Sequence, residues 1–475
     1  MIYLSVPHRV KGLPDEERRM LEDLANIFNA HQSKNAMKAK YYEGNIPLRD
    51  VNLGIALPEN ISGLEIGCAW GAKTVDVLAA RSMFDGFVGL DGSEAADLDE
   101  IIQGNMLTTA YKKACRDELE FGCTFATLSA DKDLKCRIRF SSPLTAAARW
   151  NGQKNRIDCG FAIIDTVSDE TKTSVWKPAL INLYTDKAIW VITINDYAWI
   201  AEQKPHKMGR PLMEPLVWNA TTSKPFGRSR IKEPIRRLIQ GYVRTIANAT
   251  IGLEFSTAPQ KYLLGVTNKQ YDQLINEKFR QYVGSMLLST VDPNTGEKPT
   301  FGQLPQGNIE PHVQMIRVLA TQFSAATGLT VTDTGVVNDA NPTSSDAILA
   351  QSQTLVSMAE ELNAGNGDAL RTIALMALAV ARNKSMDALT DNEKGIVAHF
   401  KNPAMPSVAS TSDAAIKIAS ARENFSQTDV FLEMIGFDQA DIRRIKAQEQ
   451  RARGLSLFGD IEAEEQEEPL DETDS

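Results

Sequence analysis

A chain of 475 residues with 43% hydrophobic and 24% charged residues has the composition of a globular protein of about two to four structural units. It holds no run of about 18 apolar residues and no basic-then-apolar start, so we expect no membrane span and no secretory signal. Its five cysteines and five histidines form no C-x-x-C, H-x-x-H or H-x-x-x-H pair. That pattern favours free, buried thiols in a reducing compartment and disfavours a disulfide framework or a metal centre.

The net charge of −10 lies mainly in the C-terminal tail. Residues Asp460–Ser475, DIEAEEQEEPLDETDS, contain nine acidic residues and no basic one, so the rest of the chain is close to neutral. A segment this polar cannot bury enough apolar surface to fold, and we expect it to be disordered. Its role stays open between a solubilising tail and a binding segment.

The first half of the chain predicts helices followed by a β-rich layer. Pro14 and Asp15 suit a helix start, and helices are also predicted from Ala69 to Arg81 and from about Asp97 to Phe121. Between Cys123 and Trp199 the apolar period changes to two, as it does at 134–140 and 157–163. Residues 188–194, AIWVITI, have the β-branched content of a buried strand.

The second half predicts mainly helices. A long amphipathic helix is expected near Ile231–Phe255, and a mixed region follows at 256–310. A helix is predicted from Pro311 to Thr327 with Gly328 as its stop, and then a polar loop at 330–343. Two more helices are expected at 344–362 and 367–382, and helical periodicity returns at 412–453. The basic residues around the first of these helices are Arg228, Arg230, Lys232, Arg236, Arg237 and Arg244.

One motif points to an enzyme. Residues Gly63–Ala80 contain E-x-G-x-x-x-G, and Asp91 follows about twenty residues on, as in the nucleotide-binding turn of an S-adenosylmethionine methyltransferase. A Rossmann fold needs strands and helices to keep alternating after that turn, whereas a long helix and antiparallel-type strands follow here. Close packing of small residues is the favoured interpretation. The chain contains no G-x-S-x-G elbow and no Walker loop.

Several segments in one order resemble a known family, the portal proteins of tailed bacteriophages of the siphophage type, which are head-tail connectors. The similar segments are Tyr41–Glu59 (YYEGNIPLRDVNLGIALPE), Gly67–Phe87, GRSRI with STAPQKYLLG, Asn338–Glu361 (NDANPTSSDAILAQSQTLVSMAEE) and Leu432–Gly454. The chain departs from the family pattern at Gly67–Trp70 (GCAW), where the family usually carries an Asn-Trp pair or a similar one.

The resemblance implies an α+β portal fold with an α/β wing, a two-helix stem, a small mixed clip, a long channel-side helix and an α-helical crown. The implied domains are the wing (1–225), the first stem helix (226–255), the clip (256–310), the second stem helix (311–328), the tunnel loop with the long helix and the return to the wing (329–384), the crown (385–458) and the disordered acidic tail (459–475).

The resemblance also implies a ring of about twelve subunits at one capsid vertex, through which the genome is packaged and ejected. Its implied partners are double-stranded DNA held without sequence preference, the packaging ATPase (terminase large subunit), the major capsid protein with its scaffold, and a head-completion adaptor. We expect no enzymatic activity, cofactor, metal or membrane partner. The expected location is the portal vertex of the virion, and the host cytoplasm during assembly.

Two sets of residues are candidates for the channel. Short polar residues without Lys or Arg suit a loop over which DNA slides, because each phosphate that a protein neutralises adds affinity. These tunnel-loop candidates are Asn338, Asp339, Asn341 and Thr343. The six basic residues named above would make inter-subunit salt bridges or a positive ring around DNA. The rival interpretations are the methyltransferase and a plain nucleic-acid-binding protein.

Overall fold

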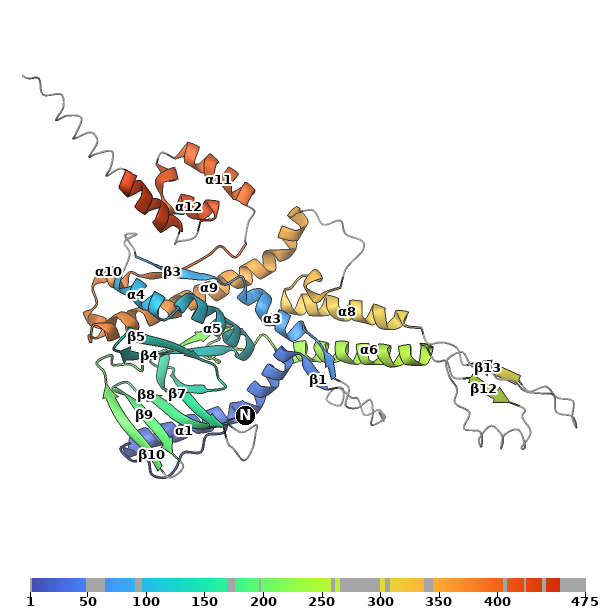
Figure 1. The fold of residues 1–475 in the computed structure, drawn as a ribbon, viewed down its shortest axis with the longest axis horizontal. Helices are drawn as coiled ribbons and strands as arrows, with labels where there is room; N and C mark the ends of the chain where they lie inside the picture. The colour runs from blue at the N-terminus through green and yellow to red at the C-terminus, as the bar shows by residue number, and fades with distance from the viewer. Residues whose placement is uncertain are drawn as a thin grey trace, which may run out of the picture. The chain divides into compact units, whose positions relative to one another are not determined.

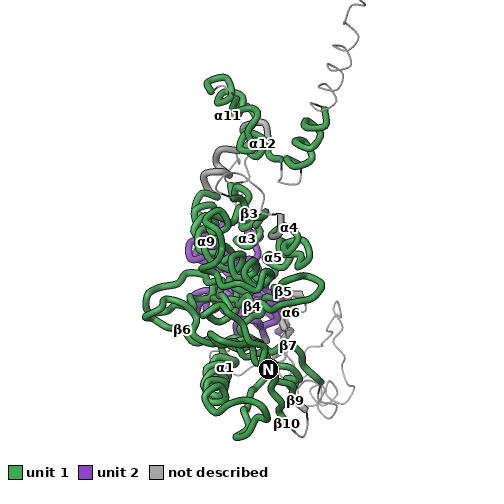
Figure 2. Tube along the Cα trace, turned by 90° about the vertical axis from the view of Figure 1, so that its left-hand side faces the viewer, with its two compact units in different colours: residues 1–35, 78–229, 352–475 green, residues 36–77, 230–351 purple. Residues whose placement is uncertain are grey.

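The structure is a computed structural model that describes residues 2–47, 65–89, 96–168, 176–195, 198–257, 261–264, 300–303, 308–336, 345–404, 408–422, 424–437 and 441–452. It contains two compact units (Figure 2). Unit 1 comprises residues 1–35, 78–229 and 352–475, and unit 2 comprises residues 36–77 and 230–351. Helices and antiparallel sheets occur in both units, so the fold class is α+β, as predicted.

Unit 1 is built around two antiparallel sheets (Figure 1). The five-stranded sheet has the order β10-β9-β8-β7-β6, and the three-stranded sheet has the order β11-β4-β5. The strands predicted at 134–140, 157–163 and 188–194 are confirmed as β5, β7 and β9. The bounds are β4 Cys123–Asp131, β5 Lys135–Ser141, β6 Ala146–Asn151, β7 Arg156–Ser168, β8 Trp176–Tyr184, β9 Ala188–Asn195, β10 Ala198–Pro205 and β11 Met213–Val217.

Helix α1, Asp15–Glu43, begins where Pro14 and Asp15 predicted. In unit 1 its apolar stripe packs on the five-stranded sheet because alternate residues of β7 and β9 point toward it. Phe28 of α1 meets Phe161 of β7 edge to face, with ring centroids 5.4 Å apart. Leu21 and Leu24 are fully buried in the same cluster as Trp190 of β9.

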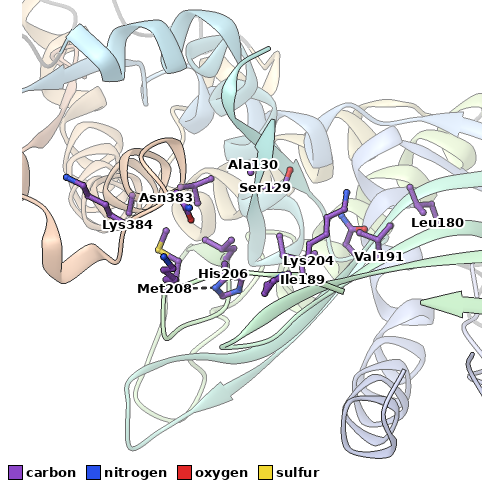
Figure 3. A pocket seen from close by; sticks show the side chains of 16 residues that line it. Ser129, Ala130, Leu180, Ile189, Val191, Lys204, His206, Met208, Asn383 and Lys384 are labelled. Atoms are coloured by element: carbon purple, nitrogen blue, oxygen red, sulfur yellow. Dashed lines mark hydrogen bonds between the residues drawn. The ribbon is translucent and has the colours of Figure 1, made fainter. Parts of the chain in front are cut away.

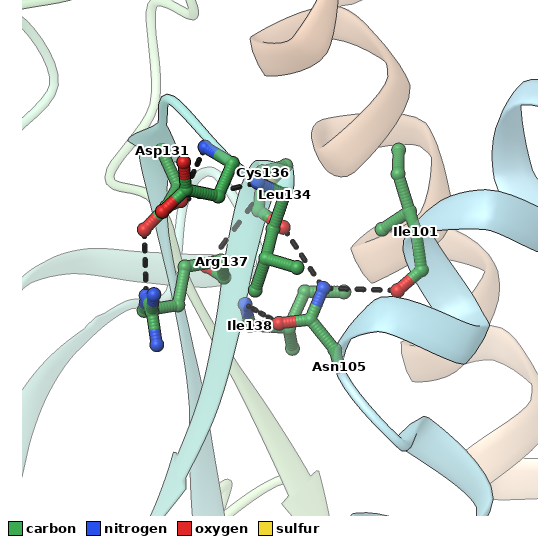
Figure 4. A network of polar contacts seen from close by, with 8 residues as sticks. Ile101, Asn105, Asp131, Leu134, Cys136, Arg137 and Ile138 are labelled. Carbon is green, nitrogen blue, oxygen red and sulfur yellow. Dashed lines mark hydrogen bonds and ion pairs between the residues drawn. The ribbon is translucent and has the colours of Figure 1, made fainter.

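The single helix predicted from Asp97 to Phe121 is wrong, because the structure has two, α4 (Ala96–Gly104) and α5 (Leu107–Phe121). Between them Met106 adopts a left-handed conformation with φ of 47°. Asn105 explains the break (Figure 4). Its side-chain amide donates to the carbonyls of Ile101 and Cys136, and its Oδ1 accepts from Ile138 N–H at 2.8 Å. The side chain thus joins the end of α4 to strand β5.

The two helices predicted at 344–362 and 367–382 are one continuous helix, α9, Ser345–Ala381. The polar stretch NAGNGD between them looked like a loop, but its amides lie against the core of unit 1. Asn363 accepts from Ser82 Oγ at 2.6 Å, and Asn366 donates to Tyr111 and Glu118. No atom lies within 4 Å of the Cβ position of Gly365, so this glycine is not needed for a close contact.

The rest of unit 1 is largely helical, as predicted for 412–453. Strands β3 (Phe84–Val88) and β14 (Val397–Phe400) form a two-stranded sheet. All five cysteines are free and buried, which confirms the prediction from their spacing. The C-terminal elements are η3 Met386–Ala388, α10 Asp391–Lys394, α11 Val408–Ala421, η4 Phe425–Gln427, α12 Asp429–Ile435 and a helical segment at 441–452.

Unit 2 contains two long helices, two small sheets and the short helix α3 (Figure 1). The long helices are α6, Glu233–Thr257, and α8, Glu310–Thr327, which confirms both predicted helices within two residues at each end. Gly328 follows α8 in the left-handed conformation and stops it, as predicted. The other elements are β1 Asn45–Pro47, β2 Glu65–Gly67, α3 Trp70–Ala79, β12 Lys261–Leu264, β13 Thr300–Gln303 and η2 Thr332–Thr334.

Candidate functional site: the two-helix element of unit 2

Helices α6 and α8 pack side by side in opposite directions (Figure 1). Along α6 and the turn before it, the buried side chains recur every four residues, from Ile231 through Ile235, Ile239 and Val243 to Ala247. On α8 the buried residues Leu319, Ala320 and Phe323 face the same contact. Gly241 makes the close approach possible, because a Cβ there would lie only 3.2 Å from Leu319 Cδ2. The antiparallel strands β12 and β13 follow α6 and precede α8, so the chain reverses its direction between the two helices.

Trp70, the first residue of α3, is wedged between the two long helices. Its ring lies 4.5 Å from the Tyr242 ring of α6 and 4.7 Å from the Phe323 ring of α8, measured between centroids. The indole N–H donates to the Thr334 carbonyl at 3.2 Å, so the polar atom of this buried ring is satisfied. Each aromatic contact of this kind adds about 0.5–1.5 kcal/mol beyond the area it buries. Trp70 therefore fixes the distance between α6 and α8.

Arg230, one of the predicted channel residues, lies inside unit 2 and is only 7% exposed. Its Nε donates to the Thr74 carbonyl of α3 at 2.6 Å, and its Nη2 donates to the Thr327 carbonyl at 2.7 Å. Thr327 ends α8, where unpaired carbonyls carry partial negative charge and favour a cation. Burial lowers the pKa of Arg230 to about 10, so the group stays charged at neutral pH.

The prediction that Arg230 faces DNA or a neighbouring subunit is therefore corrected. Its guanidinium joins α3 to the end of α8 within its own subunit. Composition and spacing could not distinguish it from the basic residues beside it. The one feature that set Arg230 apart was its position directly before Ile231, which is fully buried.

The other basic candidates lie in more open places. Arg228 belongs to unit 1 and is exposed, and Lys232 is exposed at the start of α6. Arg236 donates to the Ile231 carbonyl at 3.0 Å, and its guanidinium carbon lies 6.0 Å from the centre of the Tyr41 ring. These contacts engage part of the Arg236 guanidinium, and the side chain stays partly exposed.

Arg237 and Arg244 share the outer face of α6, because residues seven apart lie on one side of a helix. Arg237 pairs with Glu233 at 3.3 Å, with the two side chains 71% and 66% exposed. A pair this exposed contributes about 1 kcal/mol at most and leaves both groups open to other partners.

The outer face of α8 carries exposed apolar side chains beside polar ones and the exposed Arg317. Met315 is 46% exposed and Val318 is 50% exposed, although both side chains are fully apolar. Gln314 and Thr321 lie beside them, and Gln314 donates to Glu310 Oε1 at 2.6 Å. This Met315–Val318 face has no cover within the described part of the subunit.

In the glycine-rich segment Gly63–Ala80, Gly71 allows close packing. Gly71 approaches α1 so closely that a Cβ would lie 1.9 Å from the Tyr41 carbonyl oxygen. Strand β2, which precedes the turn, pairs antiparallel with β1 in a two-stranded sheet. A nucleotide-binding turn requires a parallel sheet instead. Asp91 lies outside the described residues. The arrangement favours the packing interpretation over the methyltransferase.

The FGRS segment before α6 also has a local explanation. Gly227 has a φ of 65°, and a Cβ there would meet the Trp218 carbonyl oxygen at 2.1 Å. Ser229 Oγ donates to the Glu120 carbonyl in the core of unit 1. Only glycine fits the first position without strain. The close approach of Gly227 to Trp218 and the hydrogen bond of the Ser229 hydroxyl thus hold the segment in place.

The predicted tunnel-loop residues Asn338, Asp339, Asn341 and Thr343 lie outside the described residues. In the part of the chain that the structure describes, no group of three or more His, Cys, Asp or Glu side chains could hold a metal ion. The same described part contains no helix long and apolar enough to cross a membrane.

Among solved structures, the chain is similar to three from gene transfer agent (GTA) particles, each at 12% identity. A chain of the virion of a native GTA particle matches over 74% of this chain and 86% of its own, with a TM-score of 0.43. The neck of a native GTA particle, computed with C12 symmetry, matches over 78% and 89% with a TM-score of 0.43. The neck of an empty GTA particle, computed with C6 symmetry, matches over 80% and 95% with a TM-score of 0.44.

No curated protein matches the chain. A family model does, and it covers residues 21–454, which is nearly the whole of the sequence. Its description is "Phage portal protein, SPP1 Gp6-like". The chain belongs to the SPP1 Gp6-like family of phage portal proteins.

Proposed function

We propose that this protein assembles with copies of itself into a closed ring of about twelve subunits at one vertex of a phage capsid. The ring would be the channel for packaging and ejecting the genome, and the attachment point for the packaging motor and the head-tail adaptor. The family match over residues 21–454 carries this proposal. The family is structural, so we also propose that the chain has no catalytic activity of its own.

The two-helix element supports a ring on physical grounds. An apolar helix face in water is unfavourable, and Met315 and Val318 would be covered if a neighbouring subunit packed against them. A closed ring repeats that contact and leaves no subunit with an open face. We propose that α6 and α8 form the stem, with the wing, clip, tunnel loop and crown divided as the sequence predicts.

The remaining basic residues suit weak contact with a moving polyanion. Arg237 and Arg244 are spaced two turns apart and present point charges that can meet phosphates without reading a base. We propose that they, with Arg228, Lys232 and Arg236, face either DNA or a neighbouring subunit. Asn338, Asp339, Asn341 and Thr343 remain the proposed tunnel-loop residues.

The implied partners form part of the same proposal. They are double-stranded DNA, the terminase large subunit, the major capsid protein with its scaffold, and a head-completion adaptor. We place the assembled protein in the virion and the free subunit in the host cytoplasm. Because the chain has no Walker loop, the ATPase of the motor must be a different chain.

The test is the native mass of the purified protein by light scattering, with negative-stain images of the same fraction. We expect hollow rings with a mass near about twelve times 52.3 kDa. Subunits can wait for a scaffold before they assemble, so a monomeric sample would be examined again with scaffold added. A monomer or dimer that binds S-adenosylmethionine, and that forms no ring with scaffold, would overturn the proposal.

A further inference from the structure

Unit 1 contains a cavity of about 260 Å³ to which the proposed portal function assigns no role (Figure 3). Its walls come from β4, β8 and β9, from the segment 204–208, and from the C-terminal end of α9. The floor is apolar and includes Leu180, Ile189 and Val191. Its volume is that of a few side chains, so it suits part of a peptide better than a folded partner.

The rim of the cavity is basic. Lys204, Lys207 and Lys384 line it and are exposed, and no Asp or Glu is among the residues that line it. Three cations that surround an apolar floor select for a ligand that carries negative charge beside an apolar group. A neutral apolar ligand would form no ion pair with these lysines.

Asn182 and His206 also line the cavity, and both side chains are held within the wall. Asn182 Nδ2 donates to Tyr184 Oη at 3.4 Å, and Met208 N–H donates to His206 Nδ1 at 3.4 Å (Figure 3). These two side chains are tied to the subunit, so the charge that a ligand meets lies on the lysine rim.

The chain itself contains a segment with this chemistry. Residues Asp460–Ser475 are acidic throughout, and Leu470 lies among them with acids on both sides in EEPLDE. This segment lies outside the described residues, which end at 452. The 18 residues from there to Leu470 can span up to about 60 Å when extended.

We propose that the acidic C-terminal tail binds this cavity, with Leu470 on the apolar floor and its neighbouring carboxylates on the lysine rim. The segment 204–208 and the end of α9 would be the docking surface. The proposal does not depend on the ring, because the cavity and the tail belong to one chain and binding can be measured in any assembly state.

The test uses the full-length protein with the photo-crosslinking residue benzoylphenylalanine in place of Leu470. We expect the crosslinks to map to residues 204–208 or 379–384. The double variant Lys204→Glu with Lys207→Glu should lower the crosslink yield by about fivefold, since two ion pairs are replaced by repulsion. The matched control is Lys112→Glu with Lys113→Glu, which makes the same charge change on the exposed side of α5 and should keep the yield.

Crosslinks spread over other surfaces, or an equal loss of yield in both double variants, would overturn the proposal. Amide hydrogen exchange of the unlabelled full-length chain gives an independent check. Residues 204–208 should exchange faster in Leu470→Asp than in the wild type, because the apolar anchor is lost. Equal exchange in the two proteins would count against the docked tail.

Discussion

Glu118 is a carboxyl group that the fold keeps in its uncharged form. It is completely buried in α5, and burial raises its pKa to about 8. Asn366 donates to Glu118 Oε2 at 2.8 Å, and the same amide donates to Tyr111. Burial also raises the pKa values of Tyr111 and Cys115 beside it, so these groups remain neutral through the same range. The result is a neutral polar cluster inside unit 1.

This cluster predicts a pH dependence of stability. Between the ordinary pKa of 4.5 and about 8, the folded protein holds a proton on Glu118 that the unfolded chain releases. Stability therefore falls as the pH rises through this window, by on the order of 1 kcal/mol for each pH unit. Below pH 4.5 both states are protonated and the effect is absent. We expect Glu118→Gln, which is neutral at every pH, to remove this part of the slope.

The measurement is urea unfolding of wild type and Glu118→Gln from pH 5.5 to 8.5 at one protein concentration. Asp117 and Glu214 also have raised pKa values, of about 6 and about 7, because they are buried. Their contribution is common to both proteins and cancels in the difference. Parallel stability curves for the two proteins would show that Glu118 does not titrate in this window.

In contrast to Glu118, Arg230 keeps its charge when it is buried. Its hydrogen bonds to the Thr74 and Thr327 carbonyls compensate for part of the lost hydration. The sequence could predict the helix that follows Arg230, but it could not predict this burial. A basic residue at a helix start looks the same whether its guanidinium meets water or the end of a second helix far along the chain.

At the scale of elements, Gly241 lies in the contact between α6 and α8. Gly241 faces Leu319 at a distance that leaves no room for a branched side chain. Gly252 lies on the same helix, and nothing stands within 4 Å of its Cβ position. The two glycines therefore separate the effect of crowding from the effect of helix propensity.

We expect Gly241→Val to lower the free energy of unfolding by about 1–3 kcal/mol relative to Gly252→Val, because it overpacks the helix contact. Both substitutions change the intrinsic helix propensity by the same amount. Thermal or urea unfolding followed by circular dichroism measures the difference. If the two variants are equally stable, the α6–α8 contact is looser than the structure indicates.

The elements also show what local pattern can predict. Apolar periodicity identified α1, α3, α6, α8 and the strands β5, β7 and β9, since each buries one face. It failed at Asn105, where one side chain ends a helix by bonding to a distant strand. It failed again at Asn363 and Asn366, where polar residues fill a buried network. Both failures come from contacts between residues far apart in the sequence.

At the scale of the whole molecule, the family identity came from five weak segments in the correct order, whereas the channel residues did not follow from it. The portal resemblance was predicted from the sequence and is confirmed by the family match over residues 21–454. Which side chains face a neighbour depends on the packed subunit, as the burial of Arg230 and the exposure of Met315 illustrate. Assembly is therefore best tested on faces that the fold leaves open.

The Met315–Val318 face of α8 provides such a test. We expect Met315→Asp with Val318→Asp to abolish the ring, because two carboxylates would have to be buried without partners in every subunit contact. Since both side chains are already about half exposed, the subunit should keep its circular dichroism spectrum and its unfolding midpoint. Val167→Asp is the control, since Val167 is an exposed apolar residue of β7 far from α8 in sequence, and this change should leave the native mass unaltered. Light scattering of the three proteins decides the matter. A double variant that still forms rings of full mass would mean that this face of α8 points into the channel, and that the outer face of α6, with Arg237 and Arg244, makes the contact between subunits.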